Sequence, residues 1–174
     1  MRPGMICVSN NPRFAPICHN ALQPGLTAQL GSGKSLFDRL GGIFPIAAVV
    51  NDFSDAILDN PFVGKDSPNP QLRQWSREKA ASRLPGLKWL RTLWVAALAG
   101  GPYVYVGTNP GRCPFGLEKA HSALAISGPE FDAVASELKR SLLKFQVPAQ
   151  ETSELLSAFA AHKDQVTLQL AGSC

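Results

Sequence analysis

The sequence predicts an all-α domain, and three observations support that prediction. Apolar residues recur at helical spacing from about residue 35 to residue 167, capping residues and prolines divide this region, and strand signals are almost absent. With 45% hydrophobic and 17% charged residues, the chain can bury a core, which excludes a wholly disordered or collagen-like protein. Its 174 residues fit one ordinary domain.

The first helices are delimited by capping residues and prolines. Ser35, with Asp38 three residues later, predicts a capping box that opens a short helix, and Gly41-Gly42 ends that helix. Pro45 suits the first turn of the next helix, which Asn60-Pro61 ends. One face of this second helix is apolar and carries Ile46, Val49, Val50, Phe53 and Ile57.

The middle of the chain is predicted to form two helices separated by a break. After the polar, proline-rich stretch 66–70, a helix runs from Gln71 to about Arg83. Pro85-Gly86 opens another helix, and Gly100-Gly101-Pro102 ends it. The apolar stripe of that helix is Leu87, Leu90, Trp94 and Leu98.

The last third is predicted to contain a short helix and two longer ones. A loop from Tyr103 to Pro114 leads to the short helix, which is centred on His121. Ser127 and Glu130 form a second capping box before a long helix, and Pro148 starts the last helix. The apolar faces of these two helices carry Phe131, Val134, Leu138, Leu142 and Phe145, and then Leu155, Phe159, His162 and Val166.

The first 34 residues differ in composition from the rest. They hold Arg2, Arg13 and Lys34, four prolines and no acidic residue, so they carry three of the four net positive charges. We therefore expect a flexible extension at 1–34, a folded domain at 35–167 and a tail at 168–174. The nearly neutral domain has no basic stripe, which argues against nucleic acid as a partner.

Compartment and membrane association follow from composition. No apolar run approaches the ~18 residues of a membrane-spanning helix. Four cysteines lie far apart without the paired spacing of a zinc site or a disulfide framework, namely Cys7, Cys18, Cys113 and Cys174. A reducing compartment fits best, so we expect a cytoplasmic protein, or one of an organelle matrix if residues 1–34 act as a transit peptide.

Two segments near the start of the chain each match a known functional motif only in part. Residues 28–35, Ala-Gln-Leu-Gly-Ser-Gly-Lys-Ser, fit a relaxed phosphate loop, but no buried strand precedes them and no alternating strand and helix units follow. Cys18-His19 resembles the end of a covalent haem-attachment motif, but Ala15 stands where the first thioether cysteine is needed. The haem-attachment motif is therefore excluded, and a phosphate-loop nucleotide binder stays the least favoured of three hypotheses, which Lys34→Ala would test through its ATP affinity.

The histidines are the strongest candidates for chemistry. His121 shares an apolar helical face with Leu117 and Leu124, and His162 has almost the same surroundings by spacing. A lone histidine on such a face is more often structural than a metal ligand. Periodicity does not choose between the two.

Four motifs together resemble a group I truncated haemoglobin over roughly residues 35–167. They are the run Ser35 to Gly42, the run Asn51 to Asp55, the turn Ala99 to Pro102, and His121 with Phe131 ten residues later. From His121 to Thr167 the family pattern needs no gap. The resemblance implies a shortened globin fold, a two-over-two helical sandwich around a non-covalent haem b.

The resemblance also implies roles for residues on the proximal side. His121 would be the ligand of the haem iron, with Leu117 and Leu124 as its apolar haem-contacting neighbours. Tyr105 and Lys119 would be partners of the haem propionates. His162 would lie away from the iron.

The distal side departs from the family pattern. Phe53-Ser54 stands where members usually have Phe-Tyr, and Leu87 occupies the gate position. Arg91 falls where a glutamine often lies, and it either contacts a bound ligand or propionate or swings outward to an acid such as Asp55. Lys88, once deprotonated, is a candidate sixth iron ligand. Two tryptophans complete the expected haem-binding set: Trp75, which either stacks on haem or packs in the core, and Trp94.

The implied function is binding of a diatomic gas: oxygen, nitric oxide or carbon monoxide. Oxygen transport and nitric oxide dioxygenase or reductase chemistry are left open, and turnover would require an electron-donating reductase as partner. We expect a monomer or weak dimer. The alternative is a haem-free helical interaction module of globin fold.

Overall fold

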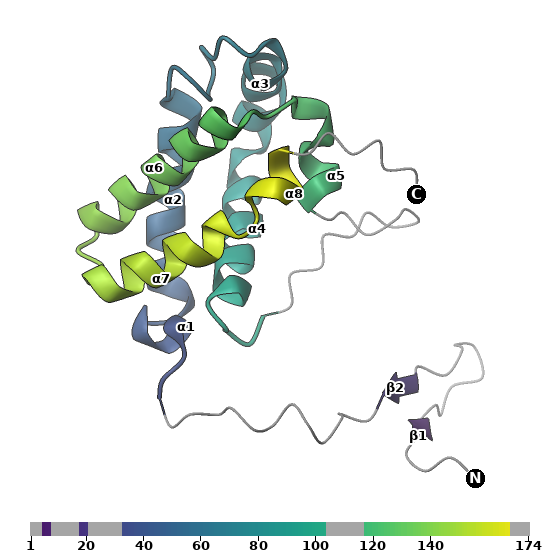
Figure 1. The fold of residues 1–174 in the computed structure, drawn as a ribbon, viewed down its shortest axis with the longest axis vertical. Coiled ribbons are helices and arrows are strands. Elements are labelled where there is room, and N and C mark those ends of the chain that lie inside the picture. The colour runs from purple at the N-terminus through teal and green to yellow at the C-terminus, as the bar shows by residue number, and fades with distance from the viewer. Residues whose placement is uncertain (1–4, 8–17, 21–32, 104–116, 168–174) are drawn as a thin grey trace. The chain divides into compact units, whose positions relative to one another are not determined.

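The structure is a computed structural model, and it describes residues 5–7, 18–20, 33–103 and 117–167 (Figure 1). The chain divides into two units, Met1–Gly33 and Lys34–Cys174. The tail 168–174, most of the predicted loop 103–114 and most of the phosphate-loop-like segment lie outside the described residues. No helix in the described ranges has the length and apolarity needed to cross a membrane.

The first unit contains two short strands that we did not predict. Strands β1 (Met5–Cys7) and β2 (Cys18–Asn20) pair antiparallel, with Ile6 opposite His19 and Cys7 opposite Cys18. Three residues are too few to show the alternation by which a strand is recognised in a sequence.

The second unit is helical throughout its described elements, which confirms the all-α prediction for the folded domain. In chain order these are α1 (Leu36–Arg39), α2 (Ile43–Asp59), α3 (Pro70–Trp75), a π-helical turn (Ser76–Ala80), α4 (Ala81–Leu98), α5 (Leu117–His121), a 3-10 turn (Ser122–Leu124), α6 (Gly128–Lys144), α7 (Ala149–Ala160) and α8 (Lys163–Thr167).

The predicted caps are present. Both capping boxes form: the side chains of Ser35 and Ser127 accept from the backbone three residues later and are bound in return by Asp38 and Glu130. Helix α4 ends in a Schellman motif, in which Gly101 N donates to Ala96 O. A Cβ on Gly101 would lie 2.6 Å from the Phe37 ring, so this glycine lets α1 approach the end of α4.

The predicted break at Pro85-Gly86 is wrong. Pro85 lies inside α4, and the chain stays helical from Pro70 to Leu98. A proline inside a helix removes one backbone hydrogen bond and usually breaks the helix. Here burial of Ala80 on one side and Val95 on the other ties both flanks to the core, so tertiary packing overrides the local preference.

Two predicted apolar faces and one predicted helix need smaller corrections. Leu90 is 44% exposed, and α4 and its C-cap instead bury Thr92, Val95, Ala96 and Ala99. Phe145 is exposed because it follows the last residue of α6. The last helix is two helices, since α7 ends at Ala160 and α8 begins at Lys163.

The helices form two crossing pairs. Helix α2 packs on α4, α6 packs on α7, and the pairs meet where α2 contacts α6 and α4 contacts α7. Figure 1 shows α6 and α7 running diagonally across α2 and α4. The main core lies between the pairs and comprises Ile46, Val49, Val50, Phe53, Val95, Ala96, Phe131, Leu138, Leu142, Leu155 and Phe159.

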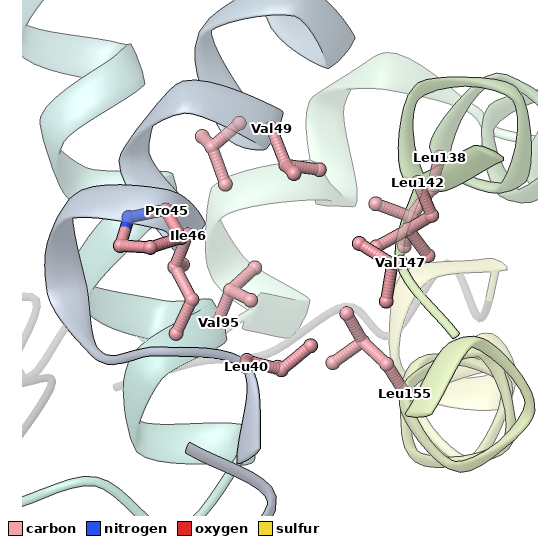
Figure 2. A pocket seen from close by; sticks show the side chains of 10 residues that line it. Leu40, Pro45, Ile46, Val49, Val95, Leu138, Leu142, Val147 and Leu155 are labelled. Atoms are coloured by element: carbon pink, nitrogen blue, oxygen red, sulfur yellow. The ribbon is translucent and has the colours of Figure 1, made fainter. Parts of the chain in front are cut away.

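A small apolar pocket lies inside this core (Figure 2). It is lined by side chains of α2, α4, α6 and α7 and by Leu40 and Val147, and its cavity volume is about 20 Å³. That space holds at most about one water, and its walls offer almost no polar partner. It is a packing defect of the core and is not a cofactor site.

Candidate functional site

His121 ends α5, and its ring is oriented by its own helix. The Nδ1 atom lies 2.7 Å from Leu117 O. Because a carbonyl oxygen only accepts, we assign the ring hydrogen to Nδ1, and the Nε2 lone pair is then available to a ligand. No described residue is hydrogen-bonded to Nε2.

The charge state of His121 suits ligation. Burial lowers the pKa of the imidazole, the bond to Leu117 O acts in the opposite direction, and the positive charge of Arg91 lowers the pKa further. The ring is therefore neutral at pH 7, and Arg91 lies near enough to affect it. Arg91 and His121 lie thirty residues apart in the sequence, and the charge of Arg91 nevertheless acts on the His121 ring.

The segment that follows His121 is fixed by Asn69, a residue that the sequence analysis missed. Asn69 caps α3, and its Nδ2 lies 3.2 Å from Leu124 O and 3.3 Å from Ala125 O. Asn69 before Pro70 is a recognisable helix start, with the cap residue followed by proline at the first helical position. The Asn-Pro pair predicts the helix cap. It does not predict the contact of Asn69 with the carbonyls of Leu124 and Ala125, which depends on the tertiary fold.

Arg91 is a half-buried cation for which the described residues provide no partner. Burial lowers the pKa of its guanidinium to about 10. Within the described part of the chain, Arg91 makes no ion pair and no hydrogen bond. The expected alternative, an outward salt bridge to Asp55, is absent from the structure, because Asp55 binds Lys88.

Lys88 joins α4 to α2. Its Nζ lies 2.7 Å from Asp55 Oδ1 and 2.8 Å from Asn51 Oδ1. An amine that donates two hydrogen bonds in an ion pair is charged and has no lone pair to offer a metal. In this arrangement Lys88 is a structural clamp.

Ser54 also has a polar side-chain atom without a partner among the described residues. Its side chain is 1% exposed, and Oγ is the buried side-chain atom that lacks a hydrogen-bond partner among the described residues. Its neighbour Phe53 belongs to the main core. An unpaired buried hydroxyl is unusual in a folded protein.

The remaining predicted site residues are distributed around this region. Leu87 and Leu117 are half-buried. Leu124 is buried in a second apolar cluster with Val63 and Leu72, and Trp75 packs against that cluster. Tyr105 lies outside the described residues, and nothing is described of the Lys119 side chain.

Trp94 and His162 contact each other. Their ring centroids lie 5.4 Å apart at 66°, and Trp94 also meets Phe159 edge-on at 5.9 Å. The His162 Nδ1 atom is 2.8 Å from Gln165 Oε1. Among the described residues, neither His121 Nε2 nor His162 Nε2 has a hydrogen bond. The two histidines differ in that the His162 ring packs against Trp94 and bonds to a side chain, whereas the His121 ring is held by a backbone carbonyl of its own helix.

Comparison with known proteins identifies the fold. No family model matches the chain. It is 26% identical over 138 residues to the group 1 truncated haemoglobin GlbN of Mycolicibacterium paratuberculosis, a match that covers 79% of this chain and 88% of that relative. The truncated haemoglobin of Tetrahymena pyriformis in its Fe(III) form superposes with a TM-score of 0.60 and 18% identity, covering 76% of this chain and 97% of that one. The chain has the truncated globin fold.

A second solved structure agrees with this identification. The 2/2 haemoglobin of Synechococcus sp. PCC 7002, described in the cyanomet state with covalently attached haem, matches with a TM-score of 0.60 and 21% identity, over 77% of this chain and 98% of that one. The crossing pairs α2–α4 and α6–α7 are the two-over-two arrangement of the shortened globin fold that the family resemblance implied.

Proposed function

We propose that this truncated globin binds haem and that His121 is the protein ligand of the iron. The observation that carries the proposal is the bond from Nδ1 to Leu117 O, which orients a neutral ring and leaves Nε2 without a partner. Metal-ligating histidines typically donate their other ring N–H to a carbonyl in this way. The relatives named above are haemoglobins, which supports the same cofactor.

The residues present fit such a group. Ser54 Oγ is a buried atom without a hydrogen-bond partner among the described residues, and native proteins satisfy nearly all such groups. His121 Nε2 and the Arg91 guanidinium, which belong to half-buried side chains, also have no hydrogen bond to a described residue. A haem with an iron-bound ligand offers a metal, carboxylates and an acceptor to match them.

Each residue then has a definite task. A bound haem iron with one imidazole ligand supplies a sixth position for a diatomic gas. His121 holds the iron, and Leu117 holds the ring of His121. Leu87 and Leu124 provide apolar surface that limits access of water, and Arg91 is a donor at the site. The missing thioether cysteine at Ala15 favours non-covalent haem b, which extraction into acidified acetone would test.

We further propose that the ligand is oxygen, nitric oxide or carbon monoxide. A small apolar site with few donors discriminates among these gases mainly through hydrogen bonds, and this chain offers Ser54 and Arg91 in place of the usual tyrosine. Dissociation rates of the three gases from the ferrous protein would rank them. Turnover of nitric oxide or oxygen would require an added reductase as electron donor. If no turnover is found with a reductase present, the protein only binds the gas.

Haem uptake tests the proposal. We expect one haemin per chain to bind to the wild-type protein, read from the Soret band, and His121→Gly to lose the spectrum of the imidazole complex. Added imidazole should restore that spectrum in His121→Gly. His162→Ala is the matched control, because it removes a histidine that is engaged with Trp94, and it should keep the wild-type spectrum.

The possible results separate the two functions. Failure of the wild-type protein to take up haem would refute the cofactor and leave the haem-free interaction module. An unchanged spectrum in His121→Gly would refute only the ligand assignment.

A further inference from the structure

We propose that Cys7 and Cys18, which lie opposite each other in the antiparallel pair of β1 and β2, form a reversible disulfide and make the first unit a thiol-redox site. The proposal concerns the unit Met1–Gly33 alone and does not depend on haem binding. It starts from the register of the two strands (Figure 1).

The register sets the distance between the backbones of the two cysteines. Directly opposed residues of antiparallel strands have Cα atoms about 4.5 Å or about 5.5 Å apart, according to whether the pair exchanges hydrogen bonds. Disulfides join residues whose Cα atoms lie about 4.4–6.8 Å apart. Both distances fall within that range, so the backbone permits a bond between Cys7 and Cys18 in either kind of pair.

Spacing in the sequence does not reveal this pair, because the two cysteines lie eleven residues apart and match neither a zinc site nor a disulfide framework. The register is specific, since a slip of one residue would place His19 opposite Cys7. A bond between Cys7 and Cys18 therefore also fixes the pairing. Because an isolated pair of such short strands is only marginally stable, the state of the two thiols decides whether the pairing persists.

The charge of the first unit favours both the reactive form of its thiols and the approach of an anionic oxidant. The unit contains Arg2 and Arg13 and no acidic residue. The thiolate is the form that attacks a disulfide, and nearby positive charge favours it. Oxidised glutathione carries a net negative charge, so the positive unit attracts it. In a reducing compartment, which the composition favours, protein disulfides are usually transient and redox-sensing.

The oxidant is a small disulfide, for which oxidised glutathione is the probe. The thiolate of one cysteine attacks a sulfur of oxidised glutathione, forms a mixed disulfide and releases one reduced glutathione. The thiolate of the other cysteine attacks the protein sulfur of that mixed disulfide, forms the Cys7–Cys18 bond and releases the second glutathione. The protein loses two electrons and two protons, and glutathione gains them. Two reduced glutathione molecules reverse the sequence.

The test uses the full-length protein, equilibrated in mixtures of oxidised and reduced glutathione, quenched with acid and alkylated at its free thiols. Trypsin cleaves after Arg13, so Cys7 and Cys18 fall in separate peptides, 1–13 and 14–34. We expect mass spectrometry to detect these two peptides joined by a disulfide as the main product of oxidation. Excess reduced glutathione should abolish the joined product.

Two variants distinguish this pairing from chance oxidation. Cys113→Ser removes a cysteine outside the first unit and should leave the joined peptides unchanged. Cys18→Ser combined with His19→Cys moves the thiol to the next position of β2, and successive positions of a strand alternate between its two faces. Because a disulfide then requires movement of the backbone, its equilibrium constant with glutathione should fall by about tenfold or more.

Three results would overturn the proposal. The first is an absence of joined peptides at every ratio of oxidised to reduced glutathione. The second is a main product in which Cys7 or Cys18 is joined to one of the other two cysteines. The third is an equal equilibrium constant for the wild type and the shifted variant, because the strand register would then play no part in bringing the thiols together.

Discussion

Two buried serines of this chain differ in whether their hydroxyl groups form hydrogen bonds. Ser54 and Ser141 are both almost fully buried, on α2 and α6. Ser141 Oγ donates to Asp52 Oδ2 at 2.8 Å, whereas Ser54 Oγ has no partner among the described residues. The two serines therefore form a natural pair for measuring what an unpaired hydroxyl costs.

Alanine at these two positions should have opposite effects on the haem-free protein. Ser54→Ala removes an unsatisfied group and should raise the free energy of unfolding by about 1 kcal/mol. Ser141→Ala removes a hydrogen bond to a carboxylate and should lower it by about 1–2 kcal/mol. Urea denaturation measures both. A loss of stability in Ser54→Ala would show that its hydroxyl does find a partner.

At this scale the sequence contains little information on which side chains pair with one another. His121 followed from the family resemblance, and its bond to Leu117 is local to one helix turn. The fate of Arg91 did not follow, because Lys88 and Arg91 lie three residues apart on α4 and either cation could be drawn to Asp55. In the structure Asp55 pairs with Lys88. The sequence pattern alone does not determine which of the two cations pairs with Asp55.

Among the elements, the short helix that carries His121 depends on a distant cap. Asn69 joins the start of α3 to the carbonyls of Leu124 and Ala125, immediately after the 3-10 turn. Helix α5 has only five residues and is too short to be stable alone. Its position therefore relies on such tertiary contacts.

Asn69→Ala should loosen this segment selectively. Losing the cap and the two carbonyl contacts should lower the free energy of unfolding by about 1–2 kcal/mol and speed amide hydrogen exchange over residues 121–125. Ser35→Ala, which removes a cap of similar kind from α1, is the control for stability without a contact to this segment. If both variants exchange equally over 121–125, Asn69 does not position the histidine.

Helices α2 and α6 are joined by a charged contact with a predictable pH dependence. Hydrogen bonds from Lys144 and then Ser141 lower the pKa of Asp52 below its ordinary value of 3.8. The folded state then binds the proton less tightly than the unfolded state, so this stabilisation is present above pH 3.8 and disappears as the pH falls through the lowered pKa.

Removing either Asp52 or Lys144 should weaken the dependence of the free energy of unfolding on pH. The stability advantage of wild type over Asp52→Asn should be at most about 1 kcal/mol near neutral pH, because solvent screens the pair, and should vanish by about pH 2. Lys144→Met should reproduce the same loss. Thermal unfolding between about pH 2 and pH 6 measures it, and a wild-type advantage that persists at the lowest pH would contradict the lowered pKa.

Element boundaries were predictable where the deciding contacts are local. The capping boxes at Ser35 and Ser127 lie within one helical turn and were found correctly. Pro85 was read as a helix start because a proline is best tolerated there, yet it lies within α4. What keeps the helix continuous is burial of residues on both sides of the proline, which is a tertiary effect.

The whole molecule consists of two units with very different roles in stability. The residues of the main core and those packed against it run from Leu36 to Val166, all within the unit Lys34–Cys174. The unit Met1–Gly33 holds two basic residues and no acid, so it contributes half of the net charge of +4. The residues of the main core and half of the net positive charge therefore lie in different units of the chain.

Deletion of residues 1–33 should therefore leave the globin intact. Because hydrophobic burial is the main source of stability and the core lies beyond residue 33, the midpoint of thermal unfolding should change by less than about 2 °C, the shift that roughly half a kcal/mol produces in a domain of this size. Haem affinity should be unchanged, since His121 and Arg91 both lie in the retained unit. Leu138→Ala is the positive control, because loss of a buried leucine from the core should lower stability by about 2–5 kcal/mol. A larger shift on deletion would mean that the first unit packs on the globin and belongs to its fold.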